Sequence, residues 1–312
     1  MKIAVMGSGG VGGFFGAKLA RAGEEVTFIA RGEHLKAIRQ HGLQIKSASE
    51  GECVVKSSTT DDPSSVGPVD LVLFSVKAFD TETAAKQILP TLSSDTVVLT
   101  LQNGLDNAEK IARIIGPERV LAGAAYVFSV IEAPGVIRHA GGGLIVFGEL
   151  DGKESDRARA ILQCVTRVGI SAQLSGEIQR NLWEKYLLIT ALSGMTALTR
   201  CPIGLIRSTP ATRRMLKLLL EEVTALASAS GVPLSPDAVE HALSMVDRLA
   251  PTSYSSLHHD LIHGRPLEIE ALQGYAMRLG ERLGIPTPML FAVYAALKPF
   301  EHGAPETDRF TT

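Results

Sequence analysis

Short apolar runs alternate with helix-like segments up to about residue 175. The runs are rich in β-branched and aliphatic residues and have the length of buried strands. They are Ile3–Val5, Val26–Ile29, Leu71–Ser75 and Val97–Leu101. Segments with the apolar spacing of helices, among them Phe14–Ala22 and Thr83–Leu89, lie between them. Strands that alternate with helices in this order predict a parallel sheet with crossover helices.

A second group of strand-like runs lies close together further along the chain. It consists of Val120–Val130, Gly135–His139 and Leu144–Phe147. The turn Glu132-Ala133-Pro134-Gly135 separates the first run from the second, and proline with glycine is typical of a chain reversal. We therefore predict an antiparallel extension at one edge of the sheet.

The strand signal ends at Ser175, and long helical patterns punctuated by prolines follow it. These patterns cover residues 177–199, 209–230, 236–248, 254–263, 268–283 and 288–297. A length of 312 residues suits about two domains. We predict an α/β fold with a Rossmann-type doubly wound sheet over residues 1–175, followed by an all-α domain over 176–312.

Composition and charge narrow the range of partners. The net charge is -2 and no long block of like charges occurs, so nothing points to nucleic acid or a membrane surface. The three cysteines are far apart, which disfavours disulfides and a structural zinc site and fits a reducing cytoplasm. The N-terminus shows no export signal, and the apolar stretch Tyr186–Leu198 is too short to span a bilayer. A small-molecule ligand is the expected partner.

A glycine-rich turn follows the first predicted strand and opens the first predicted helix. It consists of Gly7, Ser8, Gly9, Gly10, Val11 and Gly12, which match the pattern G-x-G-x-x-G. In such a turn the first glycine allows a tight bend and the second lets a pyrophosphate approach the backbone. The third lets the helix pack on the strand, and the free N–H groups at the helix start bind the anion. The turn predicts a dinucleotide site, although glycine-rich turns also serve purely structural roles.

Arg31 follows the second predicted strand, where an NAD-binding fold would place an acidic residue on the ribose. A guanidinium there can pair with a 2′-phosphate, which favours NADPH over NADH. The alternative is a solvated surface arginine. Lys77 and Asn103 each follow a parallel strand, at the edge where open α/β sheets bind ligands, or they are ordinary loop residues.

Lys185 begins an otherwise apolar helical run, so its ammonium group is expected to be partly buried. A partly desolvated lysine loses its proton more easily, which suits the proton donor that reduction of a carbonyl requires. The alternative is a helix-end lysine that reaches solvent or pairs with Glu184 or Glu177.

The segment Ser253–Asp260 carries hydroxyls and histidines at a predicted helix start, and Glu268 follows twelve residues after Ser256. The hydroxyls can be helix caps and nothing more. Because His258 and His259 are adjacent, they face different directions on a helix, so a metal site is disfavoured.

Together these features resemble the ketopantoate reductase (2-dehydropantoate 2-reductase) family over nearly the whole chain. The features that carry the resemblance are Gly7–Gly12, Arg31, Lys77, Leu101-Gln102-Asn103-Gly104, Lys185, Cys201-Pro202-Ile203-Gly204 and Ser255-Ser256…Asp260…Glu268-Ile269. The resemblance implies an NADPH-dependent enzyme that reduces ketopantoate to pantoate. It also implies a cleft between two domains and, as is common in the family, a homodimer.

The resemblance also assigns roles. Lys185 would donate the proton to the C2 oxygen, and Glu268 would orient Lys185 and the cofactor ribose. Asn103 would contact nicotinamide and substrate. Ser256, with Ser253 nearby, would bind the substrate carboxylate.

The sequence departs from the family at the substrate wall. Members that act on ketopantoate usually carry asparagines where this chain has Ile189, Ser193 and Ile203. Lys185, Ile189 and Ser193 share a helix face, so this substrate-binding wall has lost amide donors and gained apolar surface. An unsatisfied buried group costs about 1–3 kcal/mol, enough to reorder substrate preference. Two alternatives therefore stay open: a reductase of a more hydrophobic 2-oxo acid, and a non-catalytic NADPH-binding protein.

Overall fold

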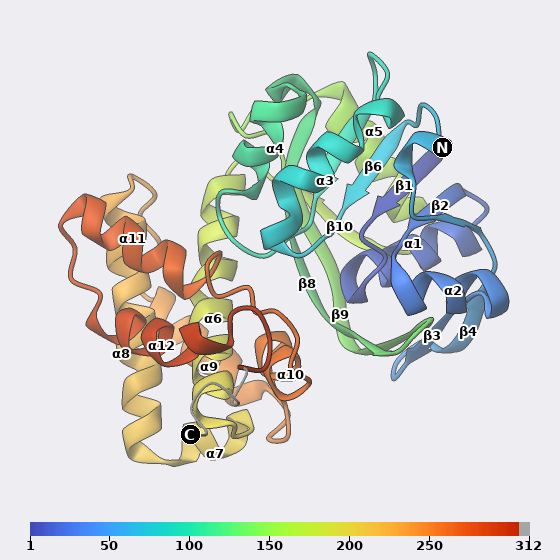
Figure 1. Cartoon of the computed structure of the whole chain (residues 1–312). Helices are drawn as coiled ribbons and strands as arrows, with labels where there is room; N and C mark the ends of the chain where they lie inside the picture. The colour runs from blue at the N-terminus through green and yellow to red at the C-terminus, as the bar shows by residue number, and fades with distance from the viewer. Residues whose placement is uncertain (306–312) are drawn as a thin grey trace. The chain divides into compact units, whose positions relative to one another are not determined.

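The computed structural model describes residues 1–305 and contains two compact units (Figure 1). The first unit is Met1–Asn181, and the second begins at Leu182.

Parallel strands form the larger part of the sheet in the first unit, as the sequence predicts. In spatial order they are β5 (Ser58–Thr60), β2 (Glu25–Ile29), β1 (Lys2–Met6), β6 (Leu71–Phe74), β7 (Val97–Thr100) and β8 (Val120–Ala133). The helices of this unit are α1 (Gly10–Arg21), α2 (Gly32–His41), α3 (Thr81–Gln87), α4 (Asn107–Ile115) and α5 (Asp156–Arg167). Short 3-10 turns also occur, among them η2 (Ala78–Asp80) after β6. The loops that follow β1, β2, β6 and β7 therefore meet at one edge of the sheet.

The predicted antiparallel extension is confirmed, with one correction. The runs Gly135–His139 and Leu144–Phe147 are not separate strands but parts of β9 (Val136–Gly148), which pairs antiparallel with β8 along most of its length. Glycines at 141–143 weaken the strand pattern of the sequence, whereas in the structure they lie beside register shifts in the β8–β9 ladder. The extension also contains strands that the apolar pattern did not predict: β3 (Leu43–Ser47), β4 (Gly51–Val55) and β10 (Ser171–Leu174).

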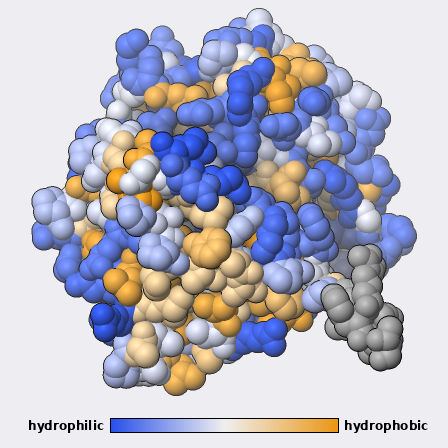
Figure 2. Space-filling view, turned by 60° about the vertical axis from the view of Figure 1, so that its left-hand side comes forward, coloured by the Kyte–Doolittle hydropathy of each residue, from blue (hydrophilic) through white to orange (hydrophobic). Residues whose placement is uncertain are grey.

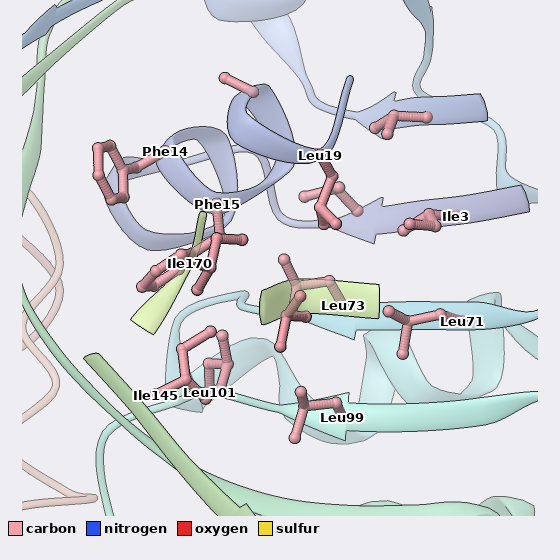
Figure 3. Packing of buried hydrophobic residues seen from close by; sticks show 14 of the residues in the cluster. Ile3, Phe14, Phe15, Leu19, Leu71, Leu73, Leu99, Leu101, Ile145 and Ile170 are labelled. Carbon is pink, nitrogen blue, oxygen red and sulfur yellow. The ribbon is translucent and has the colours of Figure 1, made fainter. Parts of the chain in front are cut away.

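One apolar core holds α1 against the sheet. Figure 3 shows Phe15 and Leu19 of α1 directed toward Leu73 of β6 and Ile3 of β1, and all four side chains are at most 2% exposed. Burying each side chain of this size contributes about 1.5–3 kcal/mol. The core thereby fixes the end of β1 and the start of α1, between which the glycine turn lies.

Helices make up the second unit, as predicted, and no strand occurs in it within residues 182–305. The helices are α6 (Ile178–Thr199, which begins in the first unit), α7 (Ile203–Ser208), α8 (Pro210–Ala229), α9 (Ala238–Arg248), α10 (Ser256–Ile262), α11 (Gln273–Leu283) and α12 (Pro288–Leu297). The sequence pattern missed α7, a short helix between two prolines. It also placed the start of α11 at residue 268, whereas residues 269–272 form turns because Ala271 and Leu272 donate backbone hydrogen bonds to the Glu268 carbonyl.

The surface mixes apolar and polar residues. Figure 2 shows one face on which hydrophobic residues are interspersed with hydrophilic ones. Within residues 1–305, no helix is both long enough and apolar enough to span a bilayer.

Candidate active site

The glycines of the turn after β1 meet very different surroundings. Gly7 has a φ of 93°, and a Cβ atom there would lie 2.7 Å from the backbone nitrogen of Val76. A Cβ on Gly12 would lie 2.2 Å from the carbonyl oxygen of Gly7, so helix and turn touch at this point. A Cβ on Gly9 would meet only the Ile131 side chain, at 3.9 Å. Gly7 and Gly12 are thus required by packing, whereas Gly9 borders open space.

The remaining residues of the turn present backbone rather than side chains. The Ser8 hydroxyl donates to the carbonyl oxygen of Ile29 at 3.0 Å, and Ser8 is 3% exposed. A Cβ on Gly10 would clash with the carbonyl oxygen of Ser129, whose hydroxyl donates to the Gly10 carbonyl. No side chain caps α1 at Gly9, which leaves the N–H groups of its first turn for a ligand. The turn therefore offers backbone N–H donors of the kind that bind anions at helix starts.

Arg31 lies at the predicted position directly after β2, as the N-cap residue of α2. Its side chain is 57% exposed and forms an ion pair with Asp80 at 3.6 Å. Asp80 ends η2, the turn that follows β6. Such a long, exposed ion pair contributes at most about 1 kcal/mol, so Arg31 can exchange this carboxylate for a ligand anion.

Lys77 and Asn103 follow β6 and β7 at the same edge of the sheet. Lys77 is the N-cap residue of η2, and the Asn103 carbonyl accepts a hydrogen bond from the Asn107 side chain. Gln102 connects their two loops, because its side-chain amide donates to the Val76 carbonyl and to the Thr81 hydroxyl. The structure thus brings Lys77 and Asn103 to the edge that carries the glycine turn.

Lys185 and Glu268 lie in the second unit, and both are 7% exposed. Lys185 is therefore not a lysine that reaches solvent. Burial lowers the pKa of Lys185 to about 8, while the negative charge of Glu268 acts in the opposite direction and raises it. A lysine with this pKa can exist in both protonation states near neutral pH, as a proton donor must.

The helix face beyond Lys185 is less polar than its sequence suggests. Ile189 is partly buried, whereas Ser193 is 4% exposed and its hydroxyl points back to the Thr190 carbonyl. Gln273 donates to that hydroxyl at 3.2 Å and to the same carbonyl at 2.7 Å. The Ser193 hydroxyl is thus held inside the unit, and Ile189 is the more accessible of the two.

The predicted carboxylate-binding serines lie at the start of α10. Ser255 is the N-cap residue and accepts a hydrogen bond from the His258 backbone, so the exposed Ser256 is not the cap. The Ser253 carbonyl accepts a hydrogen bond from the Ile203 backbone, and the Ile203 side chain is fully buried. Ile203 therefore positions the serine segment through its backbone. Within residues 1–305 no cluster of His, Cys, Asp or Glu is arranged to hold a metal ion.

Comparison with known proteins decides the family. The family described as "Ketopantoate reductase PanE/ApbA" matches residues 3–152, and its C-terminal counterpart matches residues 177–301. The chain belongs to the ketopantoate reductase family. The resemblance in the sequence motifs is thereby confirmed.

Individual relatives agree with this assignment. A 2-dehydropantoate 2-reductase of Halobacterium salinarum is 32% identical over 93% of this chain and 95% of its own. The crystal structure of a PanE/ApbA family ketopantoate reductase from Ralstonia eutropha superposes with a TM-score of 0.89 at 34% identity, covering 96% of this chain and 98% of that one. A ternary structure of D-mandelate dehydrogenase with NADH and anilino(oxo)acetate has the same TM-score at 26% identity and the same coverage.

Family membership makes the chain an oxidoreductase of the 2-dehydropantoate 2-reductase type that uses a nicotinamide cofactor. Sequence reasoning gave Gln102 no role of its own and missed two further residues near the candidate site, Gln273 and His34. Gln102 and Gln273 are buried amides that donate to backbone carbonyls, and His34 contacts the glycine turn. A buried polar residue next to a motif is the signal that would have found them, but burial is visible only after folding.

Proposed function

We propose that this ketopantoate reductase family member uses NADPH to reduce a 2-oxo acid to the 2-hydroxy acid, with ketopantoate as the leading substrate. The observation that carries the proposal is the buried Lys185, whose pKa of about 8 suits a proton donor. The negative charge of Glu268 favours its protonated form. A buried ammonium group destabilises the folded state, so its presence favours a chemical role for Lys185.

The residues of the glycine turn fit a dinucleotide. Gly9 borders open space where Gly7 and Gly12 do not, and the start of α1 has no side-chain cap. A pyrophosphate held there would accept hydrogen bonds from backbone N–H groups. Arg31 would pair with the 2′-phosphate in place of Asp80, which is the reason to prefer NADPH.

The chemistry requires a hydride and a proton. A bound NADPH supplies the hydride that C2 of the 2-oxo acid accepts. As the carbonyl π bond breaks, its electron pair moves to the oxygen, and Lys185 donates a proton to that oxygen and becomes neutral. Glu268 favours the protonated form of Lys185 before the step, and water then restores the proton. Asn103 would contact the nicotinamide and the substrate, and the hydroxyls of Ser253 and Ser256 would bind the substrate carboxylate.

A second substrate has its own support. The wall beside Lys185 presents Ile189, while the Ser193 hydroxyl is held by Gln273 and the Ile203 side chain is buried. A hydroxyl on the substrate would find few partners on this wall, which favours a 2-oxo acid with an apolar side chain. The structural similarity to a D-mandelate dehydrogenase is in keeping with this candidate.

A panel of 2-oxo acids tests both candidates. NADPH oxidation is followed with ketopantoate, 2-oxoisovalerate and benzoylformate, and kcat/KM is compared at one pH. Ketopantoate as the best substrate would support the leading proposal. A preference of about tenfold or more for either apolar acid would replace it with the second candidate, since that ratio matches the cost of one unsatisfied buried group. No oxidation with any acid, despite NADPH binding, would contradict both.

A further inference from the structure

His34 connects the glycine turn to a distant hairpin. It lies in the first turns of α2, and its Nε2 atom is 2.8 Å from the carbonyl oxygen of Ser8. On the other side of the ring, the backbone N–H of Gly135 donates to Nδ1 at 3.0 Å. Gly135 belongs to the turn between β8 and β9 and packs against α2, because a Cβ there would meet the Ala37 side chain at 2.9 Å.

These two contacts fix the tautomer of the ring. Because the Gly135 N–H is a donor, Nδ1 must act as the acceptor. The ring proton therefore lies on Nε2 and is donated to the Ser8 carbonyl. Burial lowers the pKa of His34, while the Ser8 carbonyl raises it less, so the ring is neutral at pH 7. The nearby charges of α2 are paired elsewhere, Glu33 with Lys36 and Arg31 with Asp80.

The Ser8 carbonyl belongs to the peptide that begins the cofactor turn. In a planar trans peptide the C=O and the following N–H point in opposite directions. A carbonyl held toward His34 therefore directs the Gly9 N–H away from His34. In the reverse orientation the carbonyl oxygen of Ser8 would lie where the N–H now points, and an oxygen repels an anionic ligand.

Gly9 makes this orientation easy to lose. With no side chain, Gly9 reaches many backbone conformations, so the Ser8–Gly9 peptide can rotate at small steric cost. Ser8 itself is fixed by its N–H and its hydroxyl, both of which donate to the Ile29 carbonyl. Neither of these bonds restrains the Ser8 carbonyl, which leaves that task to His34.

We propose that His34 is a positioning residue of the cofactor site, which holds the Ser8–Gly9 peptide with its N–H toward the cofactor pyrophosphate. The inference rests on the proposed function only in requiring that the glycine turn seats the cofactor. It applies to NADPH and NADH alike, since both carry the same pyrophosphate, whereas Arg31 would act on the 2′-phosphate alone.

Paired substitutions separate this role from a structural one. In His34→Gln the amide nitrogen reaches close to the position of Nε2 and can still donate to the Ser8 carbonyl. In His34→Asn the shorter side chain keeps an acceptor near Nδ1 for Gly135 but loses the donor to Ser8. His41→Gln, at the exposed end of the same helix, is the matched control. Dissociation constants for NADPH and NADH are measured by fluorescence, with the melting temperature of each variant.

We expect His34→Asn to raise both dissociation constants about tenfold, the effect of one lost hydrogen bond. His34→Gln should stay within about threefold of wild type, because the donor to Ser8 is retained. At saturating NADPH, the KM for the 2-oxo acid should not change. Equal losses in the two variants, or wild-type affinity in His34→Asn, would overturn the proposal. A loss of affinity for NADPH alone in His34→Asn would also overturn it. If Arg31→Ala weakened NADPH and NADH equally, that result would count only against the NADPH assignment.

Discussion

The glycine turn and the surroundings of Lys185 are two candidate ligand-binding regions with opposite physical character. The turn consists mainly of closely packed backbone groups, and the Ser8 hydroxyl and the carbonyls of Ser8 and Gly10 have partners in Ile29, His34 and Ser129. The Lys185 region instead buries a titratable side chain whose pKa is far from its ordinary value. The glycine turn is thus distinguished by its backbone packing, and the Lys185 region by a buried charge.

This difference predicts opposite responses to substitution. Enlarging Gly7 or Gly12 should harm both stability and binding, because no space is free for a side chain at either position. Removing the charge at Lys185 should slow catalysis but stabilise the folded state, because a buried ammonium group is destabilising.

Lys185→Met should lower kcat for 2-oxo acid reduction by about 10²–10⁴, the usual contribution of a positioned acid. The same variant should be more stable than wild type. A pKa lowered from 10.5 to about 8 means that the buried charge lowers the free energy of unfolding by about 3 kcal/mol below pH 8. Turnover is measured by NADPH oxidation and stability by urea unfolding.

Lys217→Met on α8 is the control, since Lys217 is 46% exposed and forms only long ion pairs. It should leave both kcat and stability near wild type. Unchanged turnover in Lys185→Met would refute the role of Lys185 as the proton donor.

The two regions also differ in how far the sequence predicts them. The turn Gly7–Gly12 can be predicted as a dinucleotide site from its spacing alone, because the G-x-G-x-x-G pattern lies directly between a predicted strand and a predicted helix. Lys185 is suggested by its apolar neighbours, but Glu268 lies far along the chain, and only the family resemblance connected the two. The Ser193 contact with Gln273 and the Ile203 contact with Ser253 depend on tertiary packing, and no local pattern encodes them. Likewise β3 pairs with the edge of β9 and β4 pairs with β3, although neither sequence is strongly apolar.

Gly12→Ala and Gly9→Ala form a pair that tests the glycine turn. A Cβ at residue 12 would lie 2.2 Å from a backbone oxygen, so the turn must shift, at a cost of about 1–3 kcal/mol in stability and with loss of NADPH binding. A Cβ at residue 9 meets no atom within 3.9 Å, so this variant should keep the wild-type melting temperature. Its NADPH dissociation constant should still rise, because the methyl group occupies the side open to the pyrophosphate. Tight NADPH binding by Gly9→Ala would show that the pyrophosphate lies elsewhere.

Arg31→Ala tests which nicotinamide cofactor the first unit prefers. Loss of one charged partner of a phosphate should raise the NADPH dissociation constant by about 10–100-fold. The NADH dissociation constant should hardly change, because NADH has no 2′-phosphate. Arg39→Ala is the matched control: Arg39 lies on the same helix, is 51% exposed and pairs with Asp61. Equal losses for both cofactors would remove Arg31 from the 2′-phosphate site.

The pH dependence of reduction probes the charge at Lys185 without any substitution. Only protonated Lys185 can donate a proton, so kcat/KM should be level below pH 8 and fall by up to about tenfold for each further pH unit. Glu268→Gln should move the fall to lower pH, because the lost charge favours the protonated lysine. The stability of the folded state should change in the opposite direction. Between pH 8 and the ordinary pKa of 10.5, the unfolded chain holds a proton that the folded chain has lost, so Lys185 makes unfolding harder as pH rises. A rate that stays level to pH 10 would mean that another group supplies the proton.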